Sequence, residues 1–147
     1  MDLSGLKWPI IIALIAGIVF IASSPGVNYL VSNFTDANPG EDPERDKIDE
    51  AGLSRIGGYL MYQFRYERAM DVMQTAINRY GYDGANYWHN KYRTARCLDR
   101  LKRYQESYDV LQELISAEAN QYDSRVPRND ILRRHAATLR EVHSLSG

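Results

Sequence analysis

The chain has 147 residues, of which 44% are hydrophobic and 25% charged, with a formal net charge of −1 at pH 7. This composition is typical of one globular domain with an appended segment, and a pI near 6.3 argues against a nucleic-acid-binding protein, which is usually strongly basic. The only cysteine, Cys97, excludes an intramolecular disulfide and a cysteine-based metal site. Its small and apolar neighbours predict a buried structural thiol rather than a reactive one.

The N-terminal segment is predicted to be a membrane anchor. Residues 8–22 are fifteen residues without a charge, and the apolar character continues to about residue 31. A helix of fifteen residues is only ~22 Å long, whereas one of twenty-four residues is ~36 Å long and crosses a hydrocarbon core of ~30 Å. We therefore expect an anchor helix over residues 1–31 that contacts the membrane through residues 8–31. Pro25 and Gly26 are expected to kink or end it near the far side.

The alternative interpretation of this segment is a cleaved secretory signal, because Ser23 and Ser24 are small residues after an apolar run. Pro25 directly after this position argues against cleavage there. Lys7 precedes the apolar run and an acidic segment follows it, so the expected orientation is an N-terminus in the cytoplasm. The rest of the chain then lies on the far side of the membrane, which is the periplasm in a bacterium.

Residues 32–47 are predicted to be a linker. They contain two prolines and a glycine and show no apolar period, and from Asp36 to Glu50 the chain has seven acidic and two basic residues. Such a segment is typical of a solvated tether, and a strap that docks against a partner is the alternative.

The remainder of the chain contains an internal repeat. RYERAMDVMQTAI begins at Arg65, and RYQESYDVLQELI begins 38 residues later, at Arg103, with six of thirteen positions identical. The match extends backwards at the same offset, where Leu60 corresponds to Leu98. A period of this length is typical of stacked supersecondary units.

Apolar spacing predicts two helices in each copy, as hairpins over residues 50–80 and 84–119. The tight turns are expected at Phe64-Arg65 and Lys102-Arg103. In the middle of the first helix of each copy stands a small residue, Gly57 or Ala95, which allows the partner helix to approach closely.

Two stacked hairpins leave an apolar flank exposed, so a capping element is required. After the breaker-rich sequence QYDSRVPRND, apolar residues recur at helical spacing and predict a capping helix over residues 127–145. The apolar residues expected on its buried face are Ile131, Leu132, Ala136, Leu139 and Val142.

The repeat resembles the tetratricopeptide repeat (TPR) family over about residues 50–119. The likeness is carried by small residues, leucines and tyrosines at corresponding positions of the two copies, namely Gly57, Ala95, Leu60, Leu98, Tyr66, Tyr104, Ala69 and Ser107, and by Ala76 in the first copy. The period of 38 instead of the usual 34 and the missing closing proline depart from the family pattern. The resemblance implies two TPR-like hairpins. Together with the predicted anchor and capping helix, it gives an expected all-α fold: a transmembrane helix followed by a short α-solenoid of two hairpins and a capping helix, with the helical domain over residues 48–147.

Motifs that carry chemistry are missing from the sequence. There is no glycine-rich phosphate loop, no metal-ligand spacing and no nucleophile motif, and His89, His135 and His143 are scattered. We therefore expect a protein that is not an enzyme and has no cofactor, with histidines in surface or groove positions rather than as metal ligands.

A basic cluster is the strongest candidate for a binding site, since Lys91–Arg103 holds six basic residues and a single acid. In the TPR family the first helix of each unit lines a concave surface that binds peptides or helices. The resemblance thus implies a partner-binding groove with these residues: Arg55, Tyr62, His89, Tyr92, Arg93, Arg96, Arg100 and Arg133. Arginines among tyrosines favour an acidic or C-terminal peptide segment as ligand. The alternative is a solvated helix face without a ligand.

The function that follows from these expectations is a membrane-anchored scaffold or adaptor. It would be an accessory subunit or assembly factor that holds a protein partner of a membrane or envelope complex, and it would not bind nucleic acid. The alternative is a receptor or chaperone that captures peptides reversibly in the basic groove.

Overall fold

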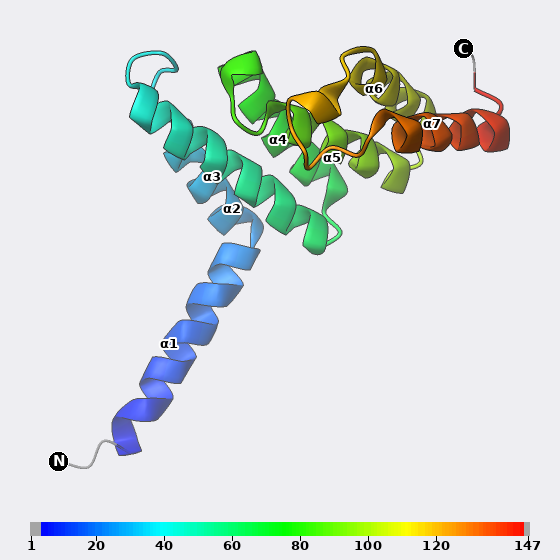
Figure 1. Cartoon of the computed structure of the whole chain (residues 1–147). Coiled ribbons are helices and arrows are strands. Elements are labelled where there is room, and N and C mark those ends of the chain that lie inside the picture. Colours follow the sequence, from blue (N-terminus) through cyan, green and yellow to red (C-terminus); the bar gives the residue numbers. More distant parts are fainter. Residues whose placement is uncertain (1–3, 146–147) are drawn as a thin grey trace. The chain divides into compact units, whose positions relative to one another are not determined.

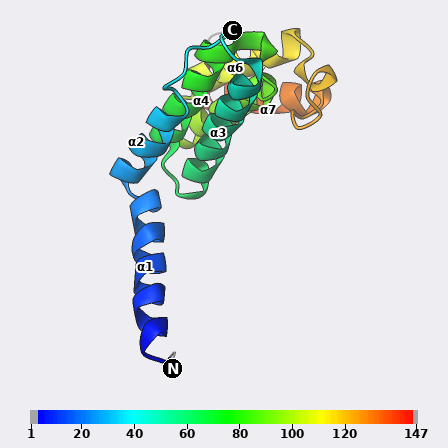
Figure 2. The ribbon, with the colours of Figure 1, turned by 90° about the vertical axis from the view of Figure 1, so that its left-hand side faces the viewer.

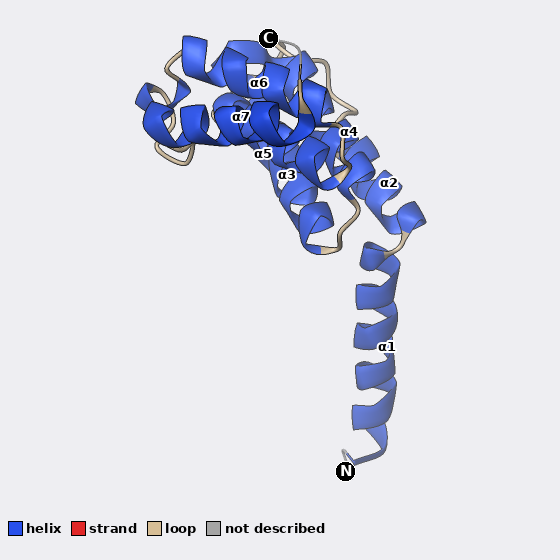
Figure 3. Cartoon of the chain, turned by 90° about the vertical axis from the view of Figure 1, so that its right-hand side faces the viewer, coloured by secondary structure: helices blue, strands red, loops and turns tan. Residues whose placement is uncertain are grey.

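The computed structural model describes residues 4–145, with side chains from Lys7 onward, and it divides the chain into two compact units, Met1–Asp36 and Ala37–Gly147. Over the described range every regular element is a helix, with seven α-helices, two short 3₁₀ helices and no strand (Figure 3). The expected all-α class is therefore confirmed.

The first unit is a broken pair of helices. The helices α1 (Ser4–Ala22) and α2 (Ser24–Asn33) are bent by 74° relative to each other. Ser23 caps α2, since its hydroxyl accepts a hydrogen bond from the Gly26 amide at 3.3 Å, and Pro25 lies in the first turn of α2. A Cβ at Gly26 would lie 1.9 Å from the Phe20 carbonyl oxygen, so this break requires glycine. The interruption expected at Pro25 and Gly26 is present, and the N-terminal apolar segment is not one continuous helix.

The surface of α1 is apolar on all sides within this unit. Its large exposed side chains include Trp8 (69%), Leu14 (62%) and Phe20 (52%), which follow one another at six-residue intervals and therefore point in three different directions around the helix. Among the described residues, no single helix has both the length and the apolar content needed to cross a membrane. The bent pair α1 and α2 together meets these two criteria.

The second unit contains the other five α-helices. They are α3 (Pro43–Tyr62), α4 (Tyr66–Tyr80), α5 (Tyr87–Arg100), α6 (Tyr104–Ser116) and α7 (Asn129–His143). The 3₁₀ helices η1 (Gly81–Asp83) and η2 (Ala119–Gln121) lie in the two longer connections. Each α-helix packs against the next one along the chain, and α3 also contacts α5 (Figure 1 and Figure 2).

The helix α3 begins earlier than its apolar pattern predicts. Residues 43–47, which we expected in the linker, form its first turn. The Asp42 carboxylate accepts hydrogen bonds from the amides of Glu44 and Arg45 at 3.0 and 3.2 Å, and Pro43 suits the first helical position. The residues of this turn are polar and solvated, so apolar spacing does not reveal that they are helical.

The two hairpin turns have the same conformation at an offset of 38 residues. Phe64 and Lys102 have positive φ values of 59° and 61°. The amide of the next residue, Arg65 or Arg103, donates to the carbonyl of Leu60 or Leu98 at 3.0 and 2.9 Å. The turns expected at Phe64-Arg65 and Lys102-Arg103 are thus confirmed, and the sequence repeat corresponds to a repeat of backbone geometry.

Small residues bring the helices of each hairpin together, as expected. A Cβ at Gly57 would lie 2.4 Å from Cγ of the buried Met73 on α4. In the second hairpin the buried Ser107 hydroxyl donates to the Ala95 carbonyl at 3.0 Å. Cys97 is also buried, and burial raises the pKa of its thiol to about 11, which agrees with a structural role.

The capping helix α7 closes the core formed by α5 and α6. Leu132, Ala136 and Leu139 are buried against residues such as Leu111 and Leu114. Ile131 and Val142, which we expected on the same buried face, are 48% and 67% exposed. They lie at the margins of an apolar stripe that is narrower than their spacing suggests.

Candidate functional site

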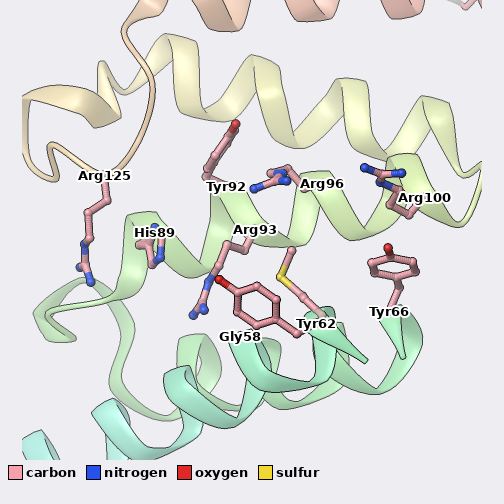
Figure 4. A pocket seen from close by; sticks show the side chains of 10 residues that line it. Gly58, Tyr62, Tyr66, His89, Tyr92, Arg93, Arg96, Arg100 and Arg125 are labelled. Carbon is pink, nitrogen blue, oxygen red and sulfur yellow. The ribbon is translucent and has the colours of Figure 1, made fainter. Parts of the chain in front are cut away.

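A cavity of about 410 Å³ lies between the second half of α3 and one face of α5 (Figure 4). We call it the basic cleft. Its lining residues come from α3, the start of α4, α5 and the segment before α7: Gly58, Met61, Tyr62, Tyr66, His89, Tyr92, Arg93, Arg96, Arg100 and Arg125.

Six of the eight residues expected in the groove line the basic cleft: Tyr62, His89, Tyr92, Arg93, Arg96 and Arg100. Arg55 is exposed on α3 one turn before Gly58 and does not line it. Arg133 is not brought to the cleft either, because α7 packs on α6 and places this residue in a separate cavity between these two helices.

The basic character of the cleft follows from the periodicity of α5. His89, Arg93, Arg96 and Arg100 are separated by four, three and four residues, so they share one face of the helix. The residues between them that are apolar, including Ala95 and Leu98, face the core. The amphipathic pattern of α5 therefore directs its cationic residues to the side that faces α3.

Arg93 is a structural member of the cleft. Its Nη2 donates hydrogen bonds to the carbonyl and hydroxyl oxygens of Ser54 on α3, at 2.9 and 2.7 Å, and to Oδ1 of Asn90. A Cβ at Gly58 would lie 2.7 Å from Nη1 of Arg93, so glycine at this position leaves room for the guanidinium. Burial and the nearby Arg125 lower the pKa of Arg93 to about 10, which still leaves it charged at pH 7.

Arg125 is held at the cleft by contacts to the connection before α5 and to its own connection between α6 and α7. Its guanidinium donates to Asn86 Oδ1 at 2.7 Å and to the Ala85 carbonyl at 3.0 Å, and it pairs with Asp123 at 2.7 Å. Asn86 in turn donates its backbone amide and its side-chain amide to the buried Glu50 carboxylate, at 2.9 and 2.6 Å. This chain of hydrogen bonds links α3 to the segment before α7.

His89 lies among these cations as a neutral imidazole. Burial, followed by the charges of Arg93 and Arg125, lowers the pKa of His89 to about 4, and Asp123 opposes this shift. Its Nδ1 atom is buried without a hydrogen-bond partner. Burial and the two guanidiniums therefore disfavour a charge on His89, and the guanidiniums also favour an anion nearby.

Arg96 and Arg100 are the available cations of the cleft. Both are exposed, and neither forms an ion pair within the described part of the chain. In the same cluster Lys91 pairs with Glu113 at 2.6 Å, and Arg103 pairs with Glu106 at 2.6 Å. Two guanidiniums without carboxylate partners, at a concave surface with tyrosines, are suited to bind carboxylates.

Four lining residues were missed by sequence reasoning. Gly58 and Met61 lie within one helical turn of Tyr62 on α3, so helical spacing was a usable signal for them. Tyr66 is the second residue of the repeated phrase and the first residue of α4, so the repeat was the usable signal for it. Arg125 had no such signal, because it reaches the cleft through the irregular segment between α6 and α7.

Within residues 4–145, no group of three or more histidine, cysteine, aspartate or glutamate side chains is arranged to hold a metal ion. A comparison of the chain with protein-family models, curated proteins and solved structures gave no significant match.

Proposed function

We propose that this protein is a membrane-attached adaptor that holds an acidic segment of a protein partner in the basic cleft, without catalysing a reaction. The observation that carries the proposal is the pair Arg96 and Arg100, which is exposed in a concave site and lacks carboxylate partners within the described chain. Carboxylates from another protein would complete the ion pairs that the chain itself does not supply.

The proposed architecture is a short TPR-like solenoid of two hairpins, α3–α4 and α5–α6, capped by α7. Three features support it: the sequence period of 38 residues, the matching turn conformations at this period, and the small residues Gly57 and Ala95 at the hairpin interfaces. In that family the first helices of successive units line the ligand-binding surface, and α3 and α5 are the helices that line the basic cleft.

The proposed attachment is through the first unit. A helix with exposed apolar side chains on all sides requires an apolar environment, and α1 and α2 together have the length and apolar content of a broken membrane span. We propose a single-pass anchor with the N-terminus in the cytoplasm and the helical domain on the far side, in the periplasm if the organism is a bacterium. The partner is then a membrane or envelope complex of which this protein is an accessory subunit or assembly factor.

The test uses the full chain in detergent micelles and a fluorescent peptide of twelve residues that is rich in aspartate. The cleft variant Arg96→Glu/Arg100→Glu is compared with Arg133→Glu/Arg140→Glu, which makes the same change of charge at exposed sites on α7. We expect the cleft variant to lose peptide binding, measured by fluorescence anisotropy, and the α7 variant to keep it.

Equal loss in both variants would show that binding depends on net charge alone and would contradict the proposal. Retention in both variants would contradict it as well. The dissociation rate of the partner purified with the protein separates the two functional alternatives, since a scaffold holds its partner for much longer than a capturing receptor.

A further inference from the structure

The spacing of the two available arginines restricts which acidic sequence fits the cleft. Arg96 and Arg100 are four residues apart on α5, so they are displaced by about 6 Å along the helix axis on one face. In an extended segment, side chains at alternate positions share one face and are about 6.6 Å apart. Adjacent side chains of an extended segment point to opposite faces, so only one of two adjacent acids faces α5.

The cleft has room for a short segment of chain between two walls. It has a volume of about 410 Å³ and is lined on one side by α5 and on the other by α3 and the start of α4. Alternate side chains of an extended segment would face these two walls.

The remaining cations of the cleft are already engaged within the chain. Arg93 donates to Ser54 and Asn90, and Arg125 is bound by Asp123, Asn86 and Ala85. Both guanidiniums contribute to the positive potential of the cleft, but they already donate hydrogen bonds to other residues of the chain. Two guanidiniums are left for the ligand, which matches two carboxylates rather than a longer acidic run.

The wall opposite α5 is aromatic. In Figure 4 the ring of Tyr62 projects from α3 toward the cleft, and Tyr66 and Arg100 lie at the same end of it. An extended segment that turns two carboxylates to α5 turns the side chain between them to the other side. That side chain then lies against Tyr62 and Tyr66.

We propose that the basic cleft selects an extended segment with two acidic residues separated by one residue, whose carboxylates pair with Arg96 and Arg100. The middle side chain packs against Tyr62 and Tyr66. This inference rests on the proposed function and adds a sequence rule for the partner, namely Asp or Glu, any residue, and Asp or Glu.

The experiment compares three peptides of equal length, composition and charge, acetylated and amidated at their ends so that only side chains carry charge. The two aspartates are adjacent in the first, separated by one residue in the second and by three residues in the third. We expect the second peptide to bind the full chain in detergent at least about tenfold more tightly than the others, since it alone makes both ion pairs.

Variants identify the source of this preference. Arg100→Gln leaves one available cation and should bring the three affinities to within about twofold of one another, whereas Arg133→Gln on α7 should leave the preference unchanged.

Other outcomes would contradict the proposal. If the three peptides bind the unmodified chain with equal affinity, and this binding is weakened by Arg100→Gln, the spacing rule is overturned and the proposed function stays intact. A preference for the third peptide would overturn the extended conformation in favour of a helical ligand. No binding of any peptide, or binding insensitive to the cleft variants, would overturn the proposed function itself.

Discussion

Two adjacent glycines in α3 have different roles at the residue scale. Gly57 faces the core, where a Cβ would meet Cγ of Met73 at 2.4 Å, and Gly58 faces the cleft, where a Cβ would meet the end of Arg93 at 2.7 Å. The first contact is with the middle of a fully buried side chain, and the second is with the end of a long one. Substitution of these two residues should therefore separate core packing from the geometry of the cleft.

Gly57→Ala is expected to lower the free energy of unfolding by about 1–2 kcal/mol, because overpacking costs ~1–3 kcal/mol and the gain in helix propensity of ~0.5–1 kcal/mol offsets only part of it. Urea denaturation of the full chain in detergent, followed by circular dichroism, measures this change. Gly58→Ala is the matched control and should change stability less. A Gly57→Ala variant as stable as the unmodified chain would show that the α3–α4 interface accommodates an added methyl group without strain.

His89 is expected to make stability depend on pH. Its pKa is about 4 in the folded chain, against the ordinary 6.5 that applies after unfolding, so the folded state favours the neutral imidazole. The stabilisation is fully present above pH 6.5 and is lost progressively as the pH falls toward 4. Unfolding free energies at pH 7 and pH 5 should therefore differ more for the unmodified chain than for His89→Gln. Identical pH dependence of the two would refute this assignment.

At the scale of the elements, one buried carboxylate connects α3 with the loop before α5. Glu50 is 4% exposed and accepts two hydrogen bonds from Asn86, and Asn86 also binds Arg125 of the cleft. Glu50 thus supports the packing of the two hairpins and, through Asn86, the position of Arg125 in the cleft.

Glu50→Ala is expected to lower the free energy of unfolding by about 2–3 kcal/mol, since it removes two hydrogen bonds to a charged group from a buried site. It should also weaken binding of the acidic peptide, because Asn86, which accepts a hydrogen bond from Arg125, loses the carboxylate that holds it in place. Glu113→Ala, which breaks a partly exposed pair with Lys91, is the control and should cost no more than about 1 kcal/mol. Similar costs in the two variants would mean that Glu50 is not a structural connection.

For the whole molecule, the two units are expected to differ in their need for detergent. The full chain exposes apolar side chains on all sides of α1, whereas a chain that begins at Ala37 retains the five helices of the second unit. The shortened chain should remain soluble and helical without detergent, measured by ultracentrifugation and circular dichroism. Aggregation of this shortened chain would mean that its surface requires a permanent partner.

A cut at residue 48, the boundary that apolar spacing indicates, provides the contrast. It removes the Asp42 cap and also Arg45, which pairs at 2.8 Å with the buried carboxylate of Asp49. A buried charge without its partner costs about 1–3 kcal/mol or more. The chain that begins at 48 should therefore unfold at a lower urea concentration than the chain that begins at 37.

Much of the second unit was predictable because its information is local. The repeat and its small residues predicted the hairpins and their turns, and helical spacing predicted the cationic face of α5. The predicted start of α3 was too late in the sequence, because apolar periodicity does not detect a helical turn made of solvated polar residues. Asp42 followed by Pro43 is a usable start signal for this helix. The spacing on α7 likewise overestimated the buried stripe, because Ile131 and Val142 lie at its margins.

By itself, the sequence determined the helical class, the duplicated unit, the break near Pro25 and the alignment of His89, Arg93, Arg96 and Arg100, because each depends on residues close together in the chain. Only the tertiary structure decided which of these side chains remain available. In the folded chain Arg93 donates a hydrogen bond to Ser54 on α3, Arg125 reaches the cleft from a distant segment, and Arg133 lies in a separate cavity. The physical reason is that a side chain's partners are set by the packing of different helices, which periodicity within one helix does not encode.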